Sequence, residues 1–138
     1  MELLDLTTDS KTKVKESQLV LPDLFDMAPF TLSISPHYKE AGAESAAWTD
    51  SFGFFEGRVR EHFIRSDFEL LVALSYPTAS YEDFRTMCDY MNSFFVFDNI
   101  SDEQDREAAA KTANVYVMAL KGEACEESRT PFYKFVSE

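Results

Sequence analysis

Apolar positions between Pro36 and Lys121 recur at intervals of three and four residues, a spacing that places them on one face of an α-helix. This pattern predicts helices over residues 36–52, 56–75, 80–100 and 103–121. The alternating pattern of a β-strand does not occur in this region. We therefore expect an all-α fold. The third helix should be central, because the segment from Phe94 to Phe97 is apolar on every side.

Residues at the predicted helix ends support these boundaries. Ser35 followed by Pro36 is a typical N-cap and first-turn pair, and we expect it to start the first helix. Ser80, with Asp83 three residues later, resembles a capping box at the start of the third helix. Gly122 follows the fourth helix as a candidate C-cap.

The segments outside the four helices are expected to be less regular. Residues 1–18 are polar, which predicts a flexible leader, and residues 19–138 form the remaining domain. Prolines between Leu19 and Pro36 exclude a long helix there, so we expect an extended segment with one short helical turn. The residues around Pro131 predict no closing element.

Composition narrows the classes of partner and location. The formal net charge of −12 disfavours nucleic acid and anionic lipid as partners, because both are negatively charged. The chain contains 13 phenylalanines, which predict apolar aromatic walls in the interior. Cys88 and Cys125 show no CxxC spacing and are expected to be free thiols. Without a signal-peptide pattern or an apolar run of about 20 residues, we expect a cytoplasmic protein that does not span a membrane.

Acidic residues cluster between positions 98 and 105. Asp98 and Asp102 are four residues apart, so on a helix they project from one face about one turn from each other. The same face continues backward through Phe95 and Met91. The pattern therefore predicts two carboxylates at the mouth of a strip of aromatic and thioether side chains.

Two interpretations of this cluster are open. In the first, Ser101 and Gln104 form a capping box, and the acids mark only the junction between two helices. In the second, Asp98 and Asp102 bind a divalent cation. The position of Asp98 near the end of a helix favours the second interpretation, because the helix dipole and the charge of Asp102 both disfavour an unpaired carboxylate there.

The ligand types indicate which cation would bind. Oxygen ligands without nearby histidine or cysteine favour Mg²⁺ or Ca²⁺. An EF-hand loop starting at Asp98 is excluded, because its sixth position is Glu103 instead of glycine and its twelfth is Ala109 instead of glutamate. One or two carboxylates, with water and phosphate completing the shell, is the usual arrangement for Mg²⁺.

The segment Asp98-Asn99-Ile100-Ser101-Asp102 resembles the D-(D/E/N)-x-x-D motif of class I terpene synthases, especially the fungal sesquiterpene synthases. The resemblance extends over about residues 19–121. The other similar segments are Leu21-Pro22-Asp23-Leu24-Phe25 with Pro29-Phe30, Pro36-His37-Tyr38, Trp48, Ser75-Tyr76-Pro77, Arg85, Asp89 and Met91-Asn92.

This resemblance implies a fold and a reaction. The fold would be the N-terminal part of the all-α class I terpenoid synthase fold, an incomplete bundle in which residues 19–138 form a partial domain. The reaction would be Mg²⁺-dependent ionisation and cyclisation of an isoprenyl diphosphate such as farnesyl diphosphate. Asp98 and Asp102 would bind the metal, and no catalytic residue is assigned. The substrate-binding residues would be Phe94, Phe95, Met91 and Asn99.

The sequence also departs from the family pattern. Ser35 replaces an expected asparagine, and Asn99 replaces the more common acid at the second motif position. Family members are much longer, and their second metal motif, diphosphate-sensing arginine and Arg-Tyr pair have no counterpart here. We therefore expect a truncated chain that is inactive alone. The alternative is a non-catalytic helical protein derived from such an enzyme and acting as a binding or interaction module.

Overall fold

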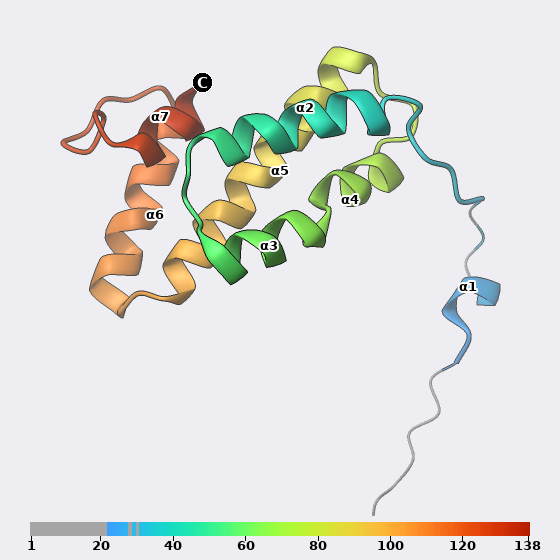
Figure 1. Ribbon diagram of the computed structural model, residues 1–138, viewed down its shortest axis with the longest axis horizontal. Helices are drawn as coiled ribbons and strands as arrows, with labels where there is room; N and C mark the ends of the chain where they lie inside the picture. Colours follow the sequence, from blue (N-terminus) through green and yellow to red (C-terminus); the bar gives the residue numbers. More distant parts are fainter. Residues whose placement is uncertain (1–21, 28, 30) are drawn as a thin grey trace, which may run out of the picture. The chain divides into compact units, whose positions relative to one another are not determined.

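The computed structural model describes residues 22–27, 29 and 31–138, and these belong to two units, Met1–Thr31 and Leu32–Glu138 (Figure 1). In the first unit, helix α1 (Leu24–Met27) matches the short helical turn expected there. The predicted leader over residues 1–18 lies outside the described residues.

The second unit is built from helices, and no strand occurs among the residues that the structure describes. The all-α prediction is therefore confirmed. None of the helices in this described part is long and apolar enough to cross a membrane. The helices are α2 (Tyr38–Ser51), α3 (Gly57–Ser66), α4 (Phe68–Ser75), α5 (Tyr81–Asp102), α6 (Arg106–Leu120) and α7 (Pro131–Ser137).

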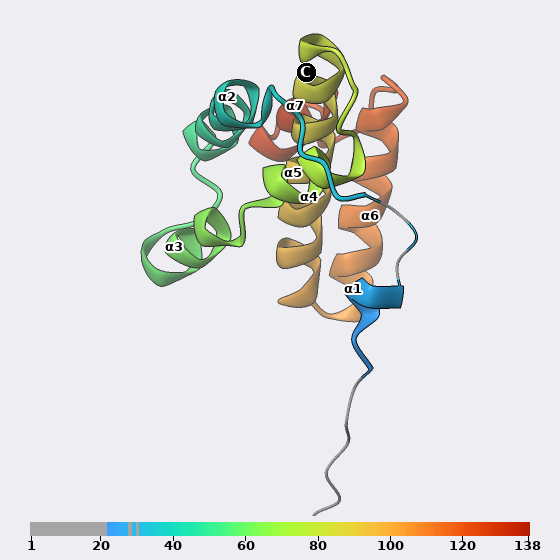
Figure 2. The same ribbon diagram turned by 90° about the vertical axis from the view of Figure 1, so that its right-hand side faces the viewer.

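Helix α5 is the central element of the second unit, as its apolar sequence predicts. It packs against α2, α4, α6 and α7. Figures 1 and 2 show it between α2 and α6. Phe84 and Val96 on α5 are completely buried. Phe84 belongs to a core cluster formed with Ala41 on α2 and Val72 on α4.

A break divides the single helix predicted over residues 56–75. Asp67 adopts a left-handed conformation with φ of 49° and separates α3 from α4. Aspartate is among the few residue types that tolerate this region. The Tyr38 hydroxyl also donates a hydrogen bond of 2.5 Å to Asp67 Oδ2. The apolar pattern continues through the break, so it gave no sign of this long-range contact.

The start of α2 also differs from the prediction, whereas the start of α5 agrees with it. The N-cap predicted at Ser35 lies two residues too early, although Ser35 Oγ does accept a hydrogen bond from the His37 backbone N–H at 3.3 Å. Ser35 is buried, its backbone N–H donates to the Ala73 carbonyl oxygen at 3.1 Å, and His37 is the N-cap. Ser35 therefore ties the incoming chain to α4. At α5, Ser80 Oγ accepts a hydrogen bond from the Asp83 backbone N–H at 3.2 Å, as expected for a capping residue.

Helix α7 contradicts the expectation that the residues around Pro131 form no closing element. Thr130 caps it by accepting a 3.2 Å hydrogen bond from the Tyr133 backbone N–H, and Pro131 occupies the first turn. Phe135 is 1% exposed, and its ring centroid lies 4.8 Å from that of Trp48 on α2. The Thr-Pro pair was the available sequence signal for this helix.

Candidate metal and substrate site on helix α5

The two acidic residues of the predicted metal site lie near the C-terminal end of α5. Helix α5 continues through Asp102, and Glu103 is its C-cap. Asp98 and Asp102 are both exposed to solvent. Their spacing of four residues on a continuous helix places them on the same face, about one turn apart. Two carboxylates in this arrangement can approach a single cation from one side.

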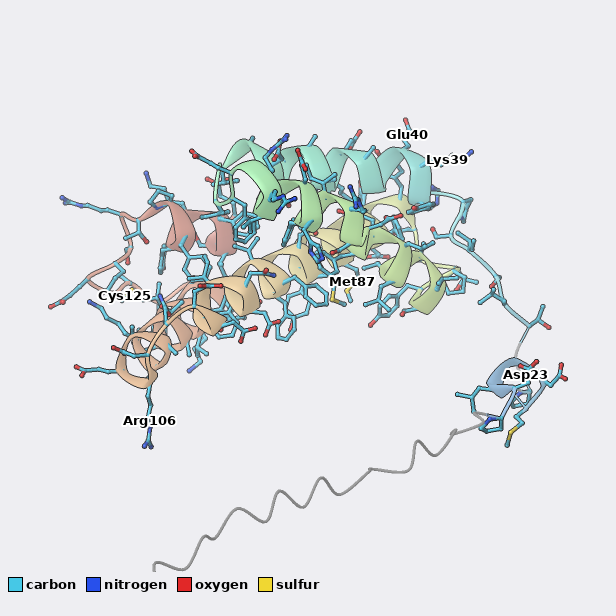
Figure 3. All side chains as sticks on the ribbon, turned by 60° about the horizontal axis from the view of Figure 1, so that its bottom comes forward. Asp23, Lys39, Glu40, Met87, Arg106 and Cys125 are labelled. Carbon is cyan, nitrogen blue, oxygen red and sulfur yellow. The ribbon has the colours of Figure 1, made fainter. Side chains whose placement is uncertain are left out.

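The helix junction is capped by a different residue. Asp105 Oδ1 accepts hydrogen bonds from the backbone N–H groups of Glu107 at 3.1 Å and Ala108 at 2.9 Å, and so caps α6. Ser101 lies within α5, and its hydroxyl donates to the Asp98 carbonyl oxygen at 3.0 Å. The capping-box interpretation at Ser101 is therefore wrong. Figure 3 labels Arg106, which begins α6 after this junction.

Aromatic and thioether side chains precede the acidic pair on α5. Phe94 is 40% exposed, whereas Phe95 is partly buried. The Phe95 ring stacks on Phe68 of α4, with a centroid distance of 3.7 Å and an interplanar angle of 12°. Met91 is partly buried and packs against the core cluster. The strip thus combines one open ring with a second ring held in place by α4.

The predicted site residues do not all share one face. At about 100° per residue, Met91 and Phe94 lie near the direction of Asp98, whereas Asn99 points about a quarter turn away. The Asn99 side-chain nitrogen donates to the Phe95 carbonyl oxygen at 2.8 Å. Within the described residues, no group of three or more histidine, cysteine, aspartate or glutamate side chains is placed to hold a metal ion.

A buried polar network that the sequence patterns did not predict lies among α2, α4 and α5. Asn92 is 1% exposed, and its side-chain nitrogen donates to Glu69 Oε1 at 2.7 Å and to Ser45 Oγ at 3.1 Å. The Ser45 hydroxyl in turn donates to Asp89 Oδ1 at 2.6 Å. Burial raises the pKa of the Asp89 carboxyl, and its bonds with Ser45 and Arg85 act against that rise.

Only one contact of this network could be predicted from the residue spacing in the sequence. Arg85 and Asp89 are four residues apart on α5, a spacing typical of a helix salt bridge, and the structure contains this ion pair. Arg85 also lies over the Trp48 ring, 5.8 Å from its centroid. Because the Ser45 and Asn92 partners are distant in sequence, helical spacing could not identify them.

Comparison with known proteins gives no matching family model but several similar sequences. Bifunctional terpene synthase Agr4 of Cyclocybe aegerita is 46% identical over 105 residues, covering 76% of this chain and 31% of Agr4. A Delta(6)-protoilludene synthase of Stereum hirsutum is 42% identical over 101 residues, covering 73% of this chain and 29% of the relative. A Coprinopsis cinerea relative named Linoleate 10R-lipoxygenase COP4 is 44% identical over 104 residues, covering 75% and 30%.

The helical fold and these relatives indicate the class of protein: over about three quarters of its length, the chain is similar to members of the terpene synthase family. Within that family, it is related to the fungal sesquiterpene synthases, so the resemblance found in the sequence is confirmed. The Coprinopsis relative has the name of an oxidative enzyme, which differs from the names of the other two. The chain spans about a third of the length of the curated relatives that it matches.

Proposed function

We propose that this chain provides one side of the active site of a Mg²⁺-dependent sesquiterpene synthase. The observation that carries the proposal is the exposed pair formed by Asp98 and Asp102 on one face of α5. The expected substrate is an isoprenyl diphosphate, with farnesyl diphosphate the first choice. The sesquiterpene synthase names of several relatives support this choice.

The chemistry of the carboxylate pair fits Mg²⁺. Asp98 and Asp102 supply oxygen ligands only, and their exposure leaves room for water and phosphate oxygens. Mg²⁺ is commonly held by one or two carboxylates together with substrate phosphates. When bound, Mg²⁺ neutralises negative charge that develops on a diphosphate leaving group. The cation is also needed for binding, because a chain with net charge −12 repels a free diphosphate.

The strip before the acids has a separate role in this proposal. The partly exposed ring of Phe94 presents a face that stabilises an allylic cation by a cation–π interaction. Phe95 and Met91 line the adjacent wall and exclude water, which would otherwise quench the cation. Asn99 lies beside this wall, with its side-chain nitrogen held by the backbone of α5. Its amide oxygen would reach the bound diphosphate only from the edge of the site, because Asn99 points about a quarter turn away from Asp98.

A chimera tests the proposal. Residues 32–138 would replace the matching segment of Agr4, and the purified protein would be incubated with farnesyl diphosphate, with Mg²⁺ or with a chelator. Gas chromatography with mass detection should find cyclic sesquiterpenes only in the presence of Mg²⁺. A folded chimera that produces none would favour the alternative, a non-catalytic binding module.

The 138-residue chain by itself is proposed to be inactive. Among its described residues no group of three or more metal-ligating side chains could hold an ion, so the Asp98–Asp102 pair would hold the diphosphate from one side, and an open wall would admit water. We also propose a cytoplasmic location, which imaging of a fluorescent fusion would test.

A further inference from the structure

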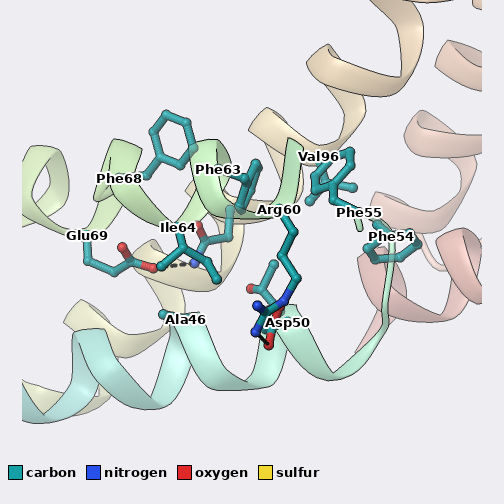
Figure 4. A pocket seen from close by; sticks show the side chains of 12 residues that line it. Ala46, Asp50, Phe54, Phe55, Arg60, Phe63, Ile64, Phe68, Glu69 and Val96 are labelled. Atoms are coloured by element: carbon teal, nitrogen blue, oxygen red, sulfur yellow. Dashed lines mark hydrogen bonds and ion pairs between the residues drawn. The ribbon is translucent and has the colours of Figure 1, made fainter. Parts of the chain in front are cut away.

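A cavity lies among α2, α3, α4 and α5 (Figure 4). Helix α5 contributes Asn92 and Val96 to it, whereas Asp98 and Phe94 are not among its lining residues. It is therefore distinct from the proposed metal and substrate site. The apolar part of its lining is formed by Ala46, Phe54, Phe55, Phe63, Ile64, Phe68 and Val96.

One polar atom in this cavity has no partner. Thr49 is 5% exposed, and its buried Oγ1 atom makes no hydrogen bond. Leaving a buried hydroxyl unpaired is unfavourable, and such groups normally find a protein or ligand partner. The neighbouring polar groups are already paired. Arg60 donates two hydrogen bonds of 2.6 Å to Asp50, and Asn92 bonds to Glu69.

Helix α3 covers the cavity and is weakly anchored. None of its residues is buried. Gly57, the first residue of α3, and Asp67, its C-cap, both adopt left-handed backbone conformations, with φ of 52° and 49°. The ion pair from Arg60 to Asp50 joins α3 to α2, but its side chains are 47% and 36% exposed. An element with few buried contacts and exposed polar contacts is expected to open locally at low cost.

The size of the cavity shows why this opening matters. With α3 in place, the cavity offers ≈ 30 Å³, which is room for about one or two water molecules. Organic ligands generally occupy pockets of several hundred cubic ångströms, on the order of 300 or more. An organic molecule can therefore reach Thr49 only if α3 moves outward.

We propose that this cavity is a second binding site, for a small neutral molecule with an apolar body and one hydroxyl or carbonyl oxygen, and that α3 opens to admit it. The rings of Phe63 and Phe68 would pack against the apolar body. The oxygen would pair with the Thr49 hydroxyl. A charged ligand is disfavoured, because Asp50 and Glu69 already have their partners and desolvating another charge is costly. This inference is independent of the proposed function.

Benzyl alcohol and toluene form a suitable pair of probes, because they differ only by one hydroxyl group. Benzyl alcohol should raise the melting temperature of the 138-residue chain in a saturable manner and slow amide hydrogen exchange in α3. In Thr49→Val, its affinity should fall about fivefold to tenfold, the effect of losing one hydrogen bond. The affinity for toluene should remain unchanged in that variant.

A matched pair of variants provides the control. Ala46 lines the cavity, whereas Ala47 is an exposed neighbour on the same helix. Ala46→Leu should abolish saturable binding, and Ala47→Leu should retain it. If Ala46→Leu does not fold, the comparison of the two probes in Thr49→Val decides alone. Absence of saturable binding, or equal binding of benzyl alcohol to wild type and Thr49→Val, would overturn the proposal and leave a cavity for water alone.

Discussion

Asp98 and Asp102 differ in their position relative to the aromatic strip, and this difference is functionally testable. Asp98 is four residues from Phe94 and thus lies one turn beyond it on α5, whereas Asp102 lies a further turn toward the end of the helix. A cation close to both the strip and a diphosphate would therefore depend more on Asp98. At Asp102, water can take the place of the carboxylate.

We predict that Asp98→Asn in the Agr4 chimera lowers turnover at least a hundredfold, which corresponds to about 3 kcal/mol in the barrier. Asp102→Asn should have a smaller effect. Asparagine keeps the shape of aspartate and removes its charge, so the comparison isolates the electrostatic contribution. Steady-state rates with farnesyl diphosphate measure the loss of turnover in each variant. Melting temperatures show whether each variant is still folded. Near-normal turnover in Asp98→Asn would rule out this metal site.

Asn92 is a second residue whose contribution can be measured, in this case to stability. Asn92→Leu removes the donor shared by Glu69 and Ser45 and leaves Glu69 Oε1 without this partner, whereas Ser45 keeps its bond to Asp89. The free energy of unfolding should fall by about 1–3 kcal/mol in urea titrations. The exposed control Thr86→Ala on the same helix should change it by less than about 0.5 kcal/mol. Equal effects of the two variants would show that the network is not stabilising.

At the scale of elements, helix α5 and the break at Asp67 show how far sequence patterns reach. Apolar periodicity and the cap at Ser80 predicted α5 closely, because both signals are local. At the break, Asp67 accepts a hydrogen bond from the Tyr38 hydroxyl, which is 29 positions away in the chain. The same limit applies to the site: spacing predicted that Asp98 and Asp102 share a face, but it could not predict the network that fixes α4 beside α5.

The bond between Tyr38 and Asp67 predicts a dependence of stability on pH. Hydrogen bonding to Asp67, with burial as a smaller cause, raises the pKa of Tyr38 from 10.0 to about 12. Because the folded-state pKa is the higher one, this contribution is fully present below pH 10 and is lost as the pH rises through about 12.

Urea titrations between about pH 9 and pH 12 measure this effect. The unfolding free energy of the wild type should fall over this range more than that of Tyr38→Phe. The exposed Tyr76 offers a matched control, and Tyr76→Phe should follow the wild type. Parallel curves for the wild type and Tyr38→Phe would show that the bond does not contribute.

For the whole molecule, the acidic charge and the Asp98–Asp102 pair predict how the 138-residue chain behaves alone. We expect helical circular dichroism but no cyclic product from farnesyl diphosphate and Mg²⁺. The physical reason is that one pair of ligands cannot enclose the diphosphate or keep water from the cation. Product analysis of the purified chain, with Agr4 as the positive control, checks this expectation. Cyclic sesquiterpenes from the chain alone would show that one carboxylate pair suffices.

One experiment tests most directly the proposal that α5 supplies metal ligands to a terpene synthase. The Agr4 chimera would be assayed with farnesyl diphosphate and Mg²⁺ beside the double variant Asp98→Asn, Asp102→Asn, with both proteins shown to be equally folded. We predict cyclic sesquiterpenes from the intact chimera and no detectable product from the double variant. Equal product yield from the two proteins would contradict the assignment of these carboxylates as Mg²⁺ ligands.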